Sequence, residues 1–107
     1  GESFDRVILD PPSFSHGPEG VMSLKRDYPA LVASSLRVLE ENGWFIAALN
    51  LGEVSPKDFH TWVREGAHKA GARLQLIYDG GQSSDFPAST AFPEGRYLKF
   101  GVWRRIR

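Results

Sequence analysis

A short apolar run that stops at an acid and two prolines constrains the fold of this chain most strongly. Arg6 to Leu9 is nearly continuous in apolar character, which is typical of a parallel strand covered on both faces. It ends at Asp10-Pro11-Pro12, where the prolines cannot donate to a strand ladder. We therefore expect a buried strand, a stiff turn and a carboxylate just past the carboxyl end of the strand. In open α/β sheets this edge is where ligands bind.

The residues that follow favour a binding site over a simple turn. Asp-Pro alone is common turn chemistry, so Asp10 can equally be a turn or helix-capping acid. Phe14 comes shortly afterwards, and residues 15–20 form a loop rich in Gly and Pro. A carboxylate, a fixed carbonyl and an aromatic ring can together hold the edge and face of a planar heterocycle. His16 in the same loop is more simply interpreted as a solvated side chain.

The composition narrows the class of protein. A length of 107 residues with 41% apolar and 24% charged residues fits one globular domain, near the lower size limit for a three-layer α/β fold. The 13 basic residues are balanced by 13 acidic ones, so no net field attracts nucleic acid. No apolar stretch is long enough to span a membrane, and the absence of cysteine excludes a disulfide or a thiol nucleophile, so a cytoplasmic location is expected.

Periodicity predicts a helix and a second buried strand after the first loop. The helix should begin near Asp27, with Pro29 in its first turn, and end at the turn signal Glu41-Asn42-Gly43. The apolar run Trp44 to Leu51 then reads as another buried strand, which carries Asn50 at its end.

A second helix has clear start and stop signals. Ser55-Pro56-Lys57-Asp58 predicts an N-cap, a first-turn proline and a capping-box acid, and Gly71 ends the helix. His60 and His68 fall outside the apolar stripe of this helix, so we expect both at the surface.

Two further strands complete the predicted pattern. Ala72 to Asp79 alternates, with Leu74, Leu76 and Tyr78 on one face, which indicates an edge strand. Arg96 to Arg104 is the last strand and, since no helix precedes it, should run antiparallel to its neighbour. Right-handed crossovers would place both helices on one face of the sheet.

This arrangement leaves the other face of the sheet without cover, although the first two strands are apolar on both sides. A large apolar patch does not stay exposed on a monomer. We expect the first strand to lie at an open edge, with cover supplied by an absent N-terminal half or by a second copy of the chain. Only a few residues precede this strand, which also suggests a piece of a larger protein.

Two motifs carry a resemblance to a known family. Asp10-Pro11-Pro12-Ser13-Phe14 resembles motif IV of class I S-adenosylmethionine-dependent methyltransferases. Asp85-Phe86-Pro87, with Phe92 to Lys99, is similar to the carboxyl-terminal signature of the subfamily that methylates large-subunit ribosomal RNA. The resemblance implies an α/β fold, a partial Rossmann-like methyltransferase sheet of strands four to seven, with the last strand antiparallel and two helices on one face. Residues 1–107 would be the C-terminal half of that domain, without the N-terminal cofactor-binding half.

The resemblance also implies a function and a set of site residues. The cofactor would be S-adenosylmethionine, the substrate RNA, and no metal would be needed. The residues implied are Asp10, Pro11 and Pro12 for catalysis, Ser13, Phe14 and Asn50 for the substrate, and Asp10 and Pro11 for the cofactor. Members that methylate carbon 5 of cytosine need a cysteine close to Asn50, and this chain has none. It therefore either methylates nitrogen, or another atom that needs no adduct, or has lost the activity.

Two alternatives remain open from the sequence. The acceptor can instead be DNA adenine or a protein amide, because similar Pro-Pro-aromatic motifs serve there. The chain can also be a non-catalytic, dimerising interaction module that has kept the truncated fold.

Overall fold

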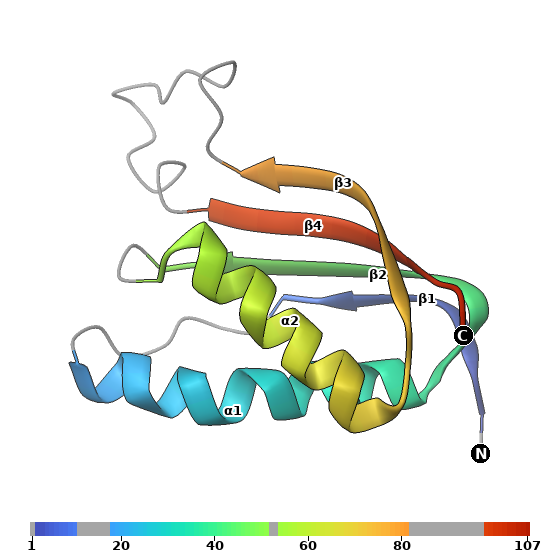
Figure 1. Ribbon diagram of the computed structural model, residues 1–107, viewed down its shortest axis with the longest axis horizontal. Coiled ribbons are helices and arrows are strands. Elements are labelled where there is room, and N and C mark those ends of the chain that lie inside the picture. Colours follow the sequence, from blue (N-terminus) through green and yellow to red (C-terminus); the bar gives the residue numbers. More distant parts are fainter. Residues whose placement is uncertain (1, 11–17, 52–53, 82–97) are drawn as a thin grey trace.

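Four strands and two helices alternate in the part of the chain that the computed structural model describes, which is residues 2–10, 18–51, 54–81 and 98–107 (Figure 1). In chain order the elements are β1 (Phe4–Leu9), α1 (Pro18–Arg37), β2 (Leu39–Asn50), α2 (Pro56–Ala70), β3 (Leu74–Gly81) and β4 (Leu98–Arg105). Among these residues no helix is long and apolar enough to cross a membrane.

The strands form one sheet in the order β1-β2-β4-β3. β1 runs parallel to β2, and β4 runs antiparallel to both β2 and β3. The last strand is therefore inserted between its two predecessors, and β1 and β3 are the edges of the sheet in the described residues. These findings confirm the predicted strand directions and edge positions.

Both helices pack on the same face of the sheet, which we call the inner face. Alternate residues of β2 point into this layer: Phe45 and Ala47 are completely buried and Leu49 is 3% exposed. The core also takes in Trp103 of β4. The remaining core members come from both helices and from the segments that join them to β2: Leu24, Tyr28, Val32, Leu36, Leu39, Leu51, Val54, Phe59, Trp62, Val63 and Ala67.

The two helices approach each other closely at a glycine. A Cβ on Gly66 of α2 would collide with the Val32 side chain and would lie 2.7 Å from the Pro29 carbonyl oxygen of α1. Only glycine allows this contact without displacing one helix, so Gly66 fixes how the helix layer sits on the sheet.

No helix covers the opposite face of the sheet among the described residues, and we call this the outer face. Ile8 is 64% exposed, Tyr78 57% and Trp44 37%. Strand register places these apolar side chains on the outer face: Ile8, Trp44, Ile46, Ala48, Tyr78, Phe100 and Val102. The predicted bare face is thus present in the structure.

The predicted bounds of α1 and β2 were wrong in instructive ways. α1 begins at Pro18 instead of Asp27, so Pro29 lies inside the helix. An interior proline costs about 3 kcal/mol, and here complete burial of Tyr28 and Pro29 offsets that cost. The Glu41-Asn42-Gly43 signal does not end the helix. It forms an irregularity within β2, where Asn42 adopts a φ of 69°.

α2 follows its sequence signals, whereas β3 departs from them. Ser55 Oγ accepts from the Asp58 N–H at 3.0 Å, and Gly71 ends the helix at a φ of 68°. In β3 the register shifts between Leu76 and Tyr78, so these residues do not share a face as predicted. Leu76 pairs with the inner-face residue Trp103, and the extra residue rotates Tyr78 onto the outer face.

Candidate functional site

The carboxyl ends of β1, β2 and β3 meet at one edge of the sheet, which we call the carboxyl edge (Figure 1). Asp10 follows β1 directly and is exposed, and Asn50 is the exposed last residue of β2. Because β1 and β2 are parallel neighbours, the structure brings these two predicted site residues to the same edge.

The other predicted site residues, Pro11, Pro12, Ser13 and Phe14, lie outside the described residues, as does His16. Most of the second motif, including Asp85 to Pro87, also lies outside them. Their roles stay predictions.

Tyr28 is a buried member of the carboxyl edge that sequence reasoning missed. Its hydroxyl donates to the Ala48 carbonyl oxygen at 3.1 Å, one residue beyond the last β1–β2 pair, Leu9–Ala47. Burial raises the pKa of the Tyr28 phenol above its ordinary value of 10.0, and the negative charge of Asp10 raises it further. Tyr28 is therefore a neutral donor at physiological pH, near enough to Asp10 to sense its charge.

Lys99 is a second buried side chain at this edge. Only 6% of it is exposed, and its Nζ donates to the Leu51 carbonyl oxygen at 2.8 Å. Lys99 pairs with Leu49 across β2 and β4, so its ammonium lies where β2 ends. A buried ammonium is stable only with strong acceptors, and its bond to Leu51 anchors the backbone just after Asn50.

Together these contacts give the carboxyl edge a fixed frame. Tyr28 from α1 and Lys99 from β4 each hold a backbone carbonyl of the β2 end, at Ala48 and Leu51. Asp10 remains exposed beside this frame. Its carboxylate can accept a hydrogen bond from a ligand N–H at this edge.

The two helical histidines behave differently from each other. His68 is exposed, as predicted. His60 is half-buried: its Nε2 lies 3.0 Å from Asp79 Oδ1, and its ring packs against Phe59 and Trp103. The prediction of a surface His60 was thus wrong, because β3 and β4 pass over that side of α2. In residues 2–10, 18–51, 54–81 and 98–107, no group of three or more His, Cys, Asp or Glu could hold a metal ion.

Curated proteins with similar sequences are methyltransferases by name. The chain is 31% identical over 99% of its length to ribosomal RNA large subunit methyltransferase I of Tolumonas auensis, and 32% identical over 92% to that of Aeromonas salmonicida. These matches span 27% and 25% of the two relatives, so the chain corresponds to about a quarter of their length. No protein-family model matches the chain.

Solved structures give the same result for the fold. SMU.776, named as a methyltransferase and solved as a complex with SAH, superposes with a TM-score of 0.72 at 28% identity, over 96% of this chain and 26% of that one. A structure named as a SAM-dependent methyltransferase from Streptococcus mutans gives 0.70 at 25% identity, over the same shares. In sequence and in fold, the chain thus resembles one quarter-length segment of large-subunit ribosomal RNA methyltransferases and of related SAM-dependent methyltransferases, as the sequence predicted.

Proposed function

We propose that this chain is the acceptor-orienting part of an S-adenosylmethionine-dependent methyltransferase that acts on RNA. The observation that carries the proposal is the sheet order β1-β2-β4-β3, with Asp10 exposed at its carboxyl edge. The similarity of nearly the whole chain to segments of methyltransferases supports the reaction class. The names of the relatives support ribosomal RNA of the large subunit as the substrate.

In this proposal residues 1–107 form the second half of a Rossmann-like domain, and the first half binds most of the cofactor. Two features of the structure support this division. Among the described residues no strand pairs with the free edge of β1. The outer face of the sheet carries the exposed side chains of Ile8 and Tyr78. The first half of the domain would cover both, with a second copy of the chain as the competing explanation.

The residues of this chain can supply part of a binding site for S-adenosylmethionine. Asp10 offers an exposed carboxylate at an open sheet edge, next to a neutral Tyr28 that carries no competing charge. Asp10 and the backbone of Pro11 would contact the cofactor there. S-adenosylmethionine supplies an electrophilic methyl group on a sulfonium when it is bound.

The remaining chemistry is positioning. Asp10 accepts an N–H of the acceptor, and the rigid Pro11–Pro12 backbone aligns the lone pair of the acceptor nitrogen. Phe14 stacks on a base taken out of its helix, and Ser13 and Asn50 contact its polar edge. No cysteine lies near Asn50, so the acceptor proposed here is a nitrogen or another atom that needs no covalent adduct, with loss of the activity as the alternative.

An isosteric change at Asp10 tests this function in the gene product that contains the chain. Asp10→Asn keeps the size of the side chain but removes its charge, and should lower methyl transfer to large-subunit ribosomal RNA by about 10²- to 10⁴-fold. Asp27→Asn is the matched control, because Asp27 is exposed and paired with Arg26 on α1. Transfer of labelled methyl groups to RNA, DNA and protein would be measured in parallel.

Methyl transfer to RNA that is lost only in Asp10→Asn supports the proposal. Transfer to DNA or to protein instead would identify the wrong substrate class. Equal activity of Asp10→Asn and the wild type would remove Asp10 from the reaction.

A further inference from the structure

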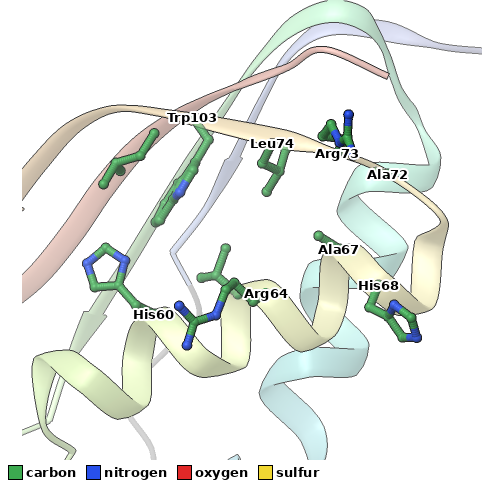
Figure 2. Close-up of a pocket in the computed structure, with 10 residues that line it drawn as sticks. His60, Arg64, Ala67, His68, Ala72, Arg73, Leu74 and Trp103 are labelled. Carbon is green, nitrogen blue, oxygen red and sulfur yellow. The ribbon is translucent and has the colours of Figure 1, made fainter.

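A groove lies between α2 and β3, at the opposite side of the sheet from β1 (Figure 2). Its volume is about 450 Å³. None of the carboxyl-edge residues Asp10, Tyr28, Asn50 and Lys99 lines it. The groove is therefore separate from the proposed methyl-transfer site.

The floor of the groove is apolar and its rim is basic. Trp103, Val63 and Ala67 are buried and form the floor together with Leu74 and Leu76. The polar lining residues are His60, Arg64, His68 and Arg73. No acidic residue lines the groove in the described part of the chain, but Asp79 Oδ1 lies 3.0 Å from His60 Nε2, so the positive charge of the rim comes from Arg64 and Arg73. This sign bias is local, because the whole chain has a formal net charge of zero.

The basic side chains follow one edge of α2. His60, Arg64 and His68 recur every fourth residue, so their Cα atoms lie about 6 Å apart along the helix. Arg73 lines the groove from the segment that leads into β3 (Figure 2). Cations on both walls of a concave surface focus a positive potential between them.

The backbone that carries these cations is well fixed. The Arg73 N–H donates to the Arg107 carbonyl oxygen at 3.1 Å, and the Arg73 carbonyl accepts from Ile106 N–H at 2.9 Å. The Arg64 guanidinium donates to Thr61 Oγ1 at 3.3 Å, one turn earlier in α2. Both arginine side chains are exposed, so their charge can be removed without opening the core.

The geometry points to this groove as a second contact site for the RNA substrate. The groove binds the sugar-phosphate backbone of a single-stranded segment of that RNA. This inference rests on the proposed function. Arg64 and Arg73 contact phosphates from the two walls, and the apolar floor accepts the flat surface of a sugar or base. Because phosphate and sugar contacts do not read the bases, such contacts position the RNA and do not select its sequence.

Salt-dependent binding tests the groove independently of methyl transfer. The probe is a fluorescein-labelled oligouridine of about 12 nucleotides, titrated with the 107-residue chain at about 50 and 200 mM salt. Arg64→Gln with Arg73→Gln should weaken binding on the order of tenfold near 0.1 M salt. It should also lower the slope of log K against log salt by about 0.7 for each lost contact.

The matched control removes the same charge from the outer face. Arg6→Gln with Arg104→Gln changes two exposed arginines whose positions flank Trp44 in the sheet register. This variant should bind the oligouridine like the wild type. Amide and indole chemical shifts of the wild type give a second readout, with changes expected at Arg64, Arg73 and the Trp103 indole.

Three outcomes would overturn the groove assignment. The first is that the wild type does not bind the oligouridine. The second is that the groove variant and the control variant lose equal affinity for it. The third is that the wild type binds an acidic peptide such as polyglutamate in place of RNA. None of these outcomes would contradict the methyltransferase proposal, because the Asp10 experiment tests that proposal separately in the gene product. Conversely, an inactive gene product whose chain still binds RNA through Arg64 and Arg73 would reject the reaction but keep the groove.

Discussion

The inner and outer faces of the sheet are built from alternate residues of the same strands, yet the inner face is buried and the outer face is exposed to solvent. On β2, Phe45 is completely buried, whereas its neighbour Trp44 is 37% exposed. Next to them, Trp103 of β4 is 5% exposed on the inner face and Tyr78 of β3 is 57% exposed on the outer face. Aromatic content does not distinguish the two faces, because Phe45 and Trp103 lie on the inner face and Trp44, Tyr78 and Phe100 on the outer face. The difference is that α1 and α2 lie on only one of them (Figure 1).

This difference shows that the apolar character of a strand does not by itself tell which of its two faces the helices of this chain cover. Removing apolar surface from water lowers the free energy by about 25 cal/mol for each Å². Covering the apolar outer face with another protein surface would therefore stabilise the sheet. The inner face should therefore dominate the stability of this chain alone, and the outer face should matter once a partner covers it.

Truncation of Phe45 should give the largest effect. Phe45→Ala leaves a cavity beside the Trp103 ring, whose centroid lies 5.8 Å away, and should lower the free energy of unfolding by about 3–5 kcal/mol. Trp44→Ala, one residue earlier on the outer face, should lower it by less than half of that amount. Urea denaturation of the chain measures both values, and equal losses would show that the two faces are equally protected.

Enlarging Gly66 should have the next largest effect, because it separates the two helices that cover the inner face. Gly66→Ala places a methyl group against Val32 and should destabilise the chain by about 1–3 kcal/mol. Adding Val32→Ala should restore little of the loss, because alanine keeps the Cβ atom that lies 2.4 Å from the new methyl group and the Pro29 carbonyl oxygen stays 2.7 Å away. Urea denaturation measures this loss, and a Gly66→Ala variant as stable as the wild type would contradict the close approach of the two helices.

Tyr28 connects the inner layer to the carboxyl edge, and its removal should be milder. Tyr28→Phe deletes the hydrogen bond to the Ala48 carbonyl and should lower the free energy of unfolding by about 0.5–1.5 kcal/mol at neutral pH.

The pH dependence of this effect follows from the raised pKa of Tyr28. Above pH 10 the unfolded chain loses the phenolic proton while the folded chain keeps it, so stability falls by up to about 1.4 kcal/mol per pH unit. Tyr28→Phe should remove this part of the alkaline loss, whereas Tyr78→Phe retains Tyr28 and should keep it. Denaturation series from pH 8 to 11 compare the three proteins, and identical alkaline slopes would contradict the burial of the Tyr28 hydroxyl.

Polar substitution of the outer face should have the smallest effect on the chain alone. Ile8→Ser should change the free energy of unfolding by no more than about 0.5 kcal/mol, because the side chain is mostly exposed. Tyr78→Ser should lower it by about 0.5–1 kcal/mol, because the exposed ring also packs on Phe100 with centroids 5.7 Å apart. Light scattering would show whether the wild type self-associates. A wild-type dimer that the two substitutions dissociate would favour a second copy as the cover of the outer face.

Local signals in the sequence were sufficient for α2. Ser55 and Gly71 act within a few residues of the helix ends, so their chemistry can be read directly. The start of α1 could not be predicted in this way, since Pro18 and Gly20 have loop-like chemistry and the helix there depends on burial of Leu24. The rotation of Tyr78 was equally hidden, because one extra residue in β3 is defined only by its pairing with β4.

Some residues of the candidate site could likewise be predicted from local sequence signals, and others could not. Asp10 and Asn50 could be predicted because each comes at the end of an apolar run, and parallel strands bring their carboxyl ends together. Tyr28 and Lys99 could not, since their partners at Ala48 and Leu51 are distant in the sequence. A helix tyrosine and a strand lysine carry no local sign that they hold the end of β2.

Calorimetric titration with S-adenosylmethionine tests most directly whether this chain is the acceptor half of a methyltransferase domain. We predict no measurable binding to the 107-residue chain alone, and binding to a longer protein that also carries the proposed cofactor-binding half of the domain. Tight binding to the chain alone would contradict the division of the domain, and no binding to the longer product would contradict the enzyme class.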